Sequence, residues 1–248
     1  MRALLLAGAV LAGSAAVSLG ADNAERGFAL FSPDGKYFAF EQFGIQDGSG
    51  FPFSTITAID LDQDKWVEGT PVMARPESED VSLSKARIDA AAKAKPILDR
   101  LHIDAPGETM ASNPVTEFVP DRKTLTFAPF YQGLGLDSIT HSLPQGGRYT
   151  LSVAEVPFPL AESCYGEDKA QYGFTLTVRD NDVGASREVY RDKTVPSSRF
   201  CPVAYDLADI FAFRQFGTPD RYVALVGIYI PGFEGLDRRL IAVPFALP

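Results

Sequence analysis

Apolar and polar residues alternate along several segments of the chain, most clearly in its second half. Tyr149, Leu151 and Val153 alternate with small or polar residues, and the segment 172–179 repeats this pattern. A period of two residues is typical of strands that bury one face in an antiparallel sheet. Strands are expected in the segments 36–41, 54–60, 124–127, 148–156, 172–179, 187–190, 210–216, 222–230 and 239–245.

One region, around residues 80–103, has a helical composition rich in Ala, Lys, Arg, Asp and Leu. Ser82 or Ser84 can cap its start, because a hydroxyl oxygen accepts a free N–H of the first helical turn. Pro96 lacks the N–H that a helix interior needs, so we expect it to kink or divide the helix. The pattern therefore predicts a mainly β, antiparallel fold with one helical insertion.

Two short motifs near the start are similar to a known repeat. Phe31–Lys36 reads Phe-Ser-Pro-Asp-Gly-Lys, and a later strand ends in Ile-Asp-Leu at Ile59–Leu61. Together they resemble one blade of the TolB-type β-propellers, which implies a partial or small propeller. The motif occurs clearly once and a propeller needs several blades, so a β-sandwich is the alternative.

The chain after its first 20 residues also resembles an uncharacterised family of predicted secreted bacterial proteins. The segments Phe31–Glu41 and Pro231–Arg239 carry this resemblance. It implies export and a shared fold, and it transfers no catalytic residue.

The N-terminus has the layout of a secretory signal peptide. Met1 and Arg2 precede a run from Ala3 to Gly20 without any charged residue. Small residues at the end of this run predict cleavage before Ala21, which leaves 21–248 as a single β-rich exported domain. The alternative is an uncleaved anchor, but the run is shorter than the roughly 20 apolar residues that span a bilayer. We expect a periplasmic or secreted protein without a membrane span after cleavage.

Two cysteines, Cys164 and Cys201, follow the leader. In an oxidising compartment we expect them to form a disulfide, worth roughly 4 kcal/mol by the chain-entropy argument. The alternative is a reactive thiol, but neither cysteine belongs to a Cys-x-x-Cys motif or lies beside a histidine.

Charge excludes one large class of partner. The formal net charge is −9, and a protein this acidic is repelled by phosphate backbones, so nucleic acid is not an expected ligand. Acidity mainly reports solubility and identifies no specific partner.

Three alternate carboxylates, Asp60, Asp62 and Asp64, suggest calcium as a candidate ligand. A calcium loop of the EF-hand type needs Gly at its sixth position and an acidic residue at its twelfth, where Lys65 and Pro71 stand. We therefore interpret the three as a solvated turn, and we predict neither a metal nor a cofactor.

The chain has two histidines, His102 and His141. Catalytic zinc usually has three protein ligands, with two of them close in sequence, and no such spacing occurs. Hydrolysis by a nucleophile beside His141, or by scattered carboxylates, stays an alternative, because catalytic side chains need to meet only in space. No Gly-x-Ser-x-Gly motif supports it.

Pro231–Gly235 is expected to form the tip of a hairpin between the last two strands. Its glycines leave Phe233 and Glu234 exposed, and Asp237 and Arg238 follow closely. An aromatic ring beside charges is typical of a recognition loop, so these four residues are the candidate partner site. The alternative is a structural hairpin in which Phe233 folds back on the core and Arg238 pairs with an acid.

A glycine-rich loop at 43–53 carries three Phe residues, which could contact a ligand or anchor the core. Taken together, these features predict an exported binding or scaffolding module that contacts an envelope protein or a cell-wall component. The alternative is a cell-envelope hydrolase.

Overall fold

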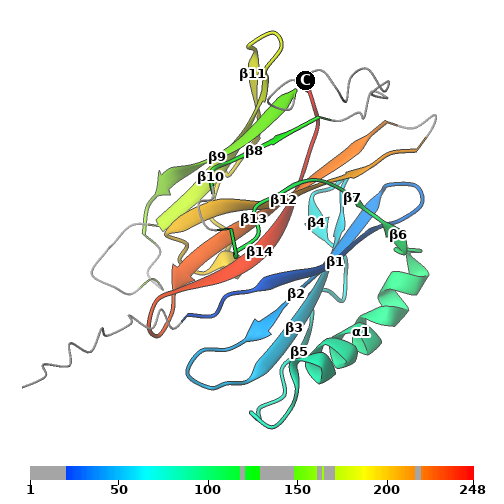
Figure 1. Ribbon diagram of the computed structural model, residues 1–248, viewed down its shortest axis with the longest axis vertical. Coiled ribbons are helices and arrows are strands. Elements are labelled where there is room, and N and C mark those ends of the chain that lie inside the picture. The colour runs from blue at the N-terminus through cyan, green and yellow to red at the C-terminus, as the bar shows by residue number, and fades with distance from the viewer. Residues whose placement is uncertain (1–20, 118–120, 129–147, 161–163, 165–170, 216–218) are drawn as a thin grey trace, which may run out of the picture.

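The computed structural model describes residues 21–117, 121–128, 148–160, 164, 171–215 and 219–248. These residues form three antiparallel sheets and one α-helix, with a short 3₁₀ helix between two of the sheets (Figure 1). The prediction of a mainly β, antiparallel fold is confirmed. His141 and the carboxylates Glu162, Glu167 and Asp168 lie outside the described residues.

The first sheet, called the N-sheet, has the order β4-β3-β2-β1-β6, with β5 paired to β3. Its members are β1 (Glu25–Phe31), β2 (Tyr37–Ile45), β3 (Pro52–Asp60), β4 (Lys65–Trp66), β5 (Val72–Ala74) and β6 (Ala105–Pro106).

The other two sheets have four strands each. The M-sheet contains, in spatial order, β11 (Ser186–Arg191), β10 (Gln171–Asp180), β9 (Tyr149–Phe158) and β8 (Thr124–Phe127). The C-sheet contains, in spatial order, β14 (Leu236–Phe245), β13 (Arg221–Pro231), β12 (Ala204–Phe213) and β7 (Glu108–Ser112).

The C-sheet lies between the other two sheets. One face packs on the M-sheet, where Leu151 and Leu176 meet Tyr205 and Val226. The other face packs on the N-sheet around Phe38. Strands β12 and β13 are therefore buried on both faces, which explains why their sequences are nearly continuous apolar runs.

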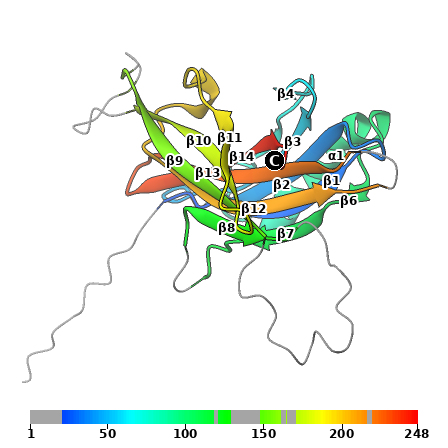
Figure 2. The same ribbon diagram turned by 90° about the horizontal axis from the view of Figure 1, so that it is seen from above.

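In Figure 2 the M-sheet strands β9 to β11 lie at the left, and the N-sheet strands β1 and β2 with helix α1 lie at the right. The described strands form no closed barrel, and the arrangement is consistent with a β-sandwich or a partial propeller. The likeness of the first blade to TolB-type repeats stays a prediction.

Helix α1 (Leu83–Arg100) covers the outer face of the N-sheet. The Ser82 side chain accepts the N–H of Lys85 at 3.2 Å, so the expected cap is confirmed. The helix continues through Pro96, so this proline does not divide it, and the expected kink stays a prediction. Ala90 and Ala94 before Pro96, and Leu98 after it, pack against the sheet and hold both halves in one helix.

Candidate functional site

A groove runs along the outer edge of the C-sheet, beside strand β14. Four consecutive residues, Arg239 to Ala242, line a cavity of about 270 Å³. Strand side chains alternate between two faces, so a cavity that touches consecutive residues lies against the edge of the strand. A second cavity of about 270 Å³ continues along this edge to Val243 and shares Trp66 and Arg199 with the first. The two cavities together are called the β14 groove.

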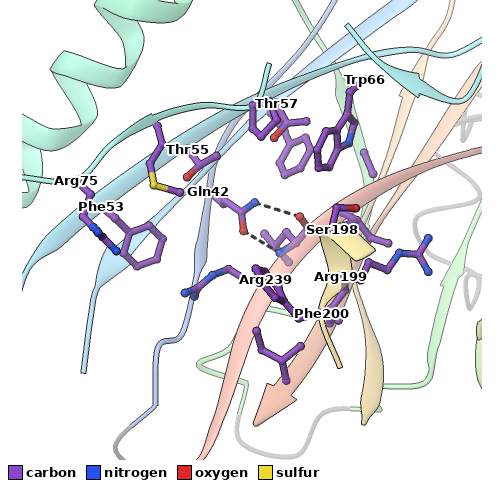
Figure 3. A pocket seen from close by; sticks show the side chains of 18 of the residues that line it. Gln42, Phe53, Thr55, Thr57, Trp66, Arg75, Ser198, Arg199, Phe200 and Arg239 are labelled. Carbon is purple, nitrogen blue, oxygen red and sulfur yellow. Dashed lines mark hydrogen bonds between the residues drawn. The ribbon is translucent and has the colours of Figure 1, made fainter. Parts of the chain in front are cut away.

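The groove has two walls from different parts of the chain (Figure 3). One wall belongs to the N-sheet and carries Phe53, Trp66 and Met73. The opposite wall is the 3₁₀ helix η1 (Ser197–Arg199) with Phe200 after it. Trp66 is 48% exposed, Met73 54% and Phe200 69%. Because large apolar side chains are seldom left this open together, the walls form a surface suited to contact with a ligand.

Gln42 of β2 fills one position beside the edge of β14 in the way that a neighbouring strand would. Its Nε2 donates to the carbonyl of Leu240 at 3.1 Å, and its Oε1 accepts the N–H of Leu240 at 2.8 Å (Figure 3). Both residues are buried. The side-chain amide therefore satisfies two backbone groups that no β-strand pairs with.

Three arginines line the first cavity, and its described lining residues include no carboxylate. Arg75 is about half exposed and has only a loose 3.6 Å contact with Glu77. Arg239 pairs with Asp22 at 2.9 Å and lies over the Phe53 ring at 5.0 Å. Arg239 is therefore neutralised by its partner, whereas Arg75 is the least firmly paired of the three arginines. A loosely paired guanidinium in this cavity favours a ligand with an acidic group.

The third arginine, Arg199, is held by a buried polar cluster behind the wall. Its guanidinium pairs with Asp192 at 2.6 Å and donates to the Tyr190 hydroxyl at 3.0 Å. The Asp192 carboxylate also accepts hydrogen bonds from the Tyr190 hydroxyl and from the backbone N–H of Phe174, both at 2.8 Å. Burial raises the pKa of Tyr190 to about 12, although the charge of Arg199 opposes the shift. The cluster fixes the position of η1.

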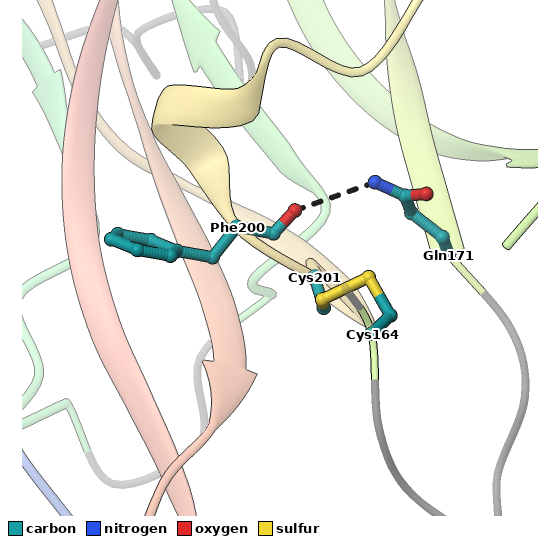
Figure 4. The surroundings of a disulfide bond; sticks show 4 residues. All are labelled: Cys164, Gln171, Phe200 and Cys201. Carbon is teal, nitrogen blue, oxygen red and sulfur yellow. Dashed lines mark hydrogen bonds between the residues drawn. A yellow bond between two sulfur atoms is a disulfide. The ribbon is translucent and has the colours of Figure 1, made fainter. Parts of the chain in front are cut away.

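The disulfide Cys164–Cys201 is present, as expected, and it supports the same wall (Figure 4). Cys201 directly follows Phe200, whose carbonyl accepts the Gln171 side chain at 3.3 Å. Phe200 has a φ of 57°, in the left-handed region that few non-glycine residues adopt. The covalent bond and the hydrogen bond thus hold the exposed Phe200 ring beside the groove.

The hairpin tip predicted as the partner site is exposed, but its four residues are not together. Phe233 is 86% exposed and Glu234 is also open to solvent. Asp237 accepts the N–H of Asp22 at 2.9 Å. Arg238 is only 4% exposed and pairs with Asp206. The structure therefore places Arg238 in the protein interior, and its pairing with an acid agrees with the structural alternative. The exposed Phe233 ring does not fold back on the core, so that part of the alternative is wrong.

The three alternate aspartates do not converge. The Asp60 carboxylate accepts hydrogen bonds from the backbone N–H groups of Asp62 and Gln63, as a turn-forming carboxylate does. Asp62 pairs with Arg221 at 2.8 Å, and Asp64 lines the second cavity of the groove. Within the described ranges, no three Asp, Glu, His or Cys residues gather in a metal-binding arrangement.

The glycine-rich loop at 43–53 divides between two roles. Phe43 lies under Arg87, whose guanidinium carbon is 3.9 Å from the ring centre. Arg87 also forms a bidentate pair with the buried Glu41, so Phe43 helps to dock α1 on the N-sheet. Phe53 instead lines the groove.

Comparison with known families gives a match that covers most of the chain. The model of the family described as "Predicted secreted protein (DUF2259)" matches residues 39–245. The chain belongs to this family. None of the curated proteins compared with the chain matches it.

Family membership supports the expected location of the protein outside the cytoplasmic membrane. The family is described as secreted, and the disulfide fits an oxidising compartment, so the protein is exported to the periplasm or beyond. In the described part of the chain, no helix has the length and hydropathy to cross a membrane. The signal peptide at residues 1–20 lies outside the described residues and stays a prediction.

Sequence reasoning missed most of the groove. Gln42, Trp66, Phe200 and Arg239 come from four separate segments, and no spacing links them. One signal was available: Trp66 is the single tryptophan of the chain and stands in a polar, turn-rich stretch where core packing does not explain it.

Proposed function

We propose that this exported protein is a binding module and that its ligand lies in the β14 groove. The observation that carries the proposal is the open apolar surface of Trp66, Met73 and Phe200 across a cavity lined by three arginines. Apolar walls with a few placed polar groups are typical of binding sites. The ligand belongs to an envelope protein or a cell-wall component, since those are the partners available to an exported protein.

The test uses the single tryptophan as a reporter. Trp66 lies in the groove wall, so a ligand that enters should shift or quench its fluorescence. Two probe classes are titrated: synthetic peptides and soluble cell-wall fragments. A saturable change with either class supports the proposal, and the absence of any change with both classes contradicts it.

Two exposed phenylalanines provide a matched pair of variants. Phe200→Ala removes a ring from the groove wall, whereas Phe233→Ala removes one from the hairpin tip. We expect Phe200→Ala to lower affinity at least tenfold and Phe233→Ala to change it less than twofold. The reverse result would move the binding site to the tip, the surface that the sequence first indicated.

The alternative of a cell-envelope hydrolase also stays a prediction. Cleavage of cell-wall fragments by the purified protein, lost in His141→Ala, would favour it over a binding module.

A further inference from the structure

We infer that the β14 groove takes its ligand as an extended peptide that adds to the edge of β14 and carries an acidic group. This inference rests on the proposed function, because it names the ligand class for the same groove.

Every second residue of β14 directs its backbone N–H and C=O away from β13, as in any antiparallel pair. Both of these groups of Leu240 form hydrogen bonds with the side chain of Gln42. The backbone N–H of Arg238 donates to the carbonyl of Asp22, and its carbonyl accepts the N–H of Ala24, both in the N-terminal segment. The outward positions of β14 therefore include 238, 240 and 242.

The outward position that follows Leu240 is Ala242. Ala242 has the same outward direction as Leu240 and lines both cavities of the groove. In the described part of the chain, no hydrogen bond to its outward N–H or C=O is formed. Outward positions 238 and 240 are thus occupied by other parts of this chain, and position 242 faces the groove. An added strand would pair with these free groups.

Pro244 limits the length of the segment that can be added to β14. Pro244 occupies the next outward position and has no N–H, so the pairing is interrupted there. Backbone pairing is therefore confined to about one residue of the ligand, and its side chains must supply the other contacts. In a strand these alternate, so one would meet the Trp66 wall and the next the Phe200 wall.

The arginines of the groove indicate that the peptide carries an acidic group. Arg75 and Arg239 line the same cavity as Ala242, and Arg75 is held only loosely by Glu77. A Glu or Asp side chain, or a terminal carboxylate, would pair with Arg75 in this cavity.

The probes are synthetic, end-capped heptapeptides with Val, Leu or Phe at the central positions and one Glu, titrated against the Trp66 signal. Peptides that bind are then N-methylated one residue at a time. We expect one central N-methyl group to lower affinity at least tenfold and its neighbours to change it less than twofold, because only one N–H faces Ala242. A uniform response along the peptide would overturn strand addition.

Charge recognition is tested with Arg75→Gln, and with Lys85→Gln on the exposed face of α1 as a matched control. The first variant should remove the preference for Glu over Gln peptides, at least fivefold, and the second should retain it. An unchanged preference in Arg75→Gln would overturn the role of Arg75.

The two levels of inference fail in different ways. If cell-wall fragments change the Trp66 signal and peptides do not, strand addition is wrong and the proposed binding module stands. If neither class changes the signal, both are wrong.

Discussion

The side chain of Gln42 is the point at which the stability of the groove floor can be measured. In Gln42→Leu, the N–H and C=O of Leu240 lose the two hydrogen bonds, of 2.8 and 3.1 Å, that they form with this side chain. A buried backbone group without a partner costs about 1–3 kcal/mol. The cavity beside Leu240 can admit water to these two groups, which lowers the cost of leaving them without a protein partner. We therefore expect a total loss of about 2–4 kcal/mol in the free energy of unfolding.

The assay is equilibrium unfolding in urea, followed by far-ultraviolet circular dichroism of the mature, oxidised protein. Gln46→Leu is the matched control, because the Gln46 side chain, on a partly exposed loop, donates one 3.3 Å hydrogen bond to Asp22. The control should lose less than about 1 kcal/mol. Equal effects of the two variants would refute the reasoning that Gln42 replaces a strand.

Two further predictions concern the η1 wall and the cluster behind it. Cys201→Ser should lower the free energy of unfolding by roughly 4 kcal/mol in urea titrations, because the disulfide is lost. It should also weaken ligand binding in the groove, because Phe200 loses its covalent anchor. Unchanged ligand affinity in this variant would contradict the anchoring role of the disulfide. Burial raises the pKa of Tyr190 to about 12 from 10.0, so the neutral phenol stabilises the fold fully below pH 10, and this stability is lost as the pH rises from 10 to 12. Two pKa units correspond to about 2–3 kcal/mol, and partial exposure reduces this, so Tyr190→Phe should make the fall in this window shallower by about 2 kcal/mol. Parallel stability curves for the variant and the wild type would contradict the assignment.

Local patterns were sufficient to predict most of the secondary structure. The segment 124–127 is a strand with the expected bounds, and 222–230 lies within β13. The start of β12 was missed because Asp206 and Asp209 interrupt the apolar run at its beginning. Both aspartates are buried and paired with arginines, and sequence periodicity alone does not reveal such pairing.

The candidate site was harder to predict because its function depends on packing between sheets. The sequence identified the exposed ring of Phe233 from its flanking glycines, which is a local property. Gln42 stands between Glu41 and Phe43 in an ordinary strand. Its role becomes visible only when β2 is placed beside Leu240, about 200 residues further along the chain.

The position of the groove follows from the widths of the sheets and from the disulfide. The N-sheet extends outward to β4 and the M-sheet to β11, whereas the C-sheet between them ends at β14. The edge of β14 therefore forms the floor between two flanking layers. The N-sheet wall is held by its own strand pairing, but the η1 wall belongs to no sheet and depends on Cys201 and the Asp192 cluster. Since disulfides persist in oxidising compartments, the complete groove is a property of the exported protein, and binding should be measured on the oxidised form.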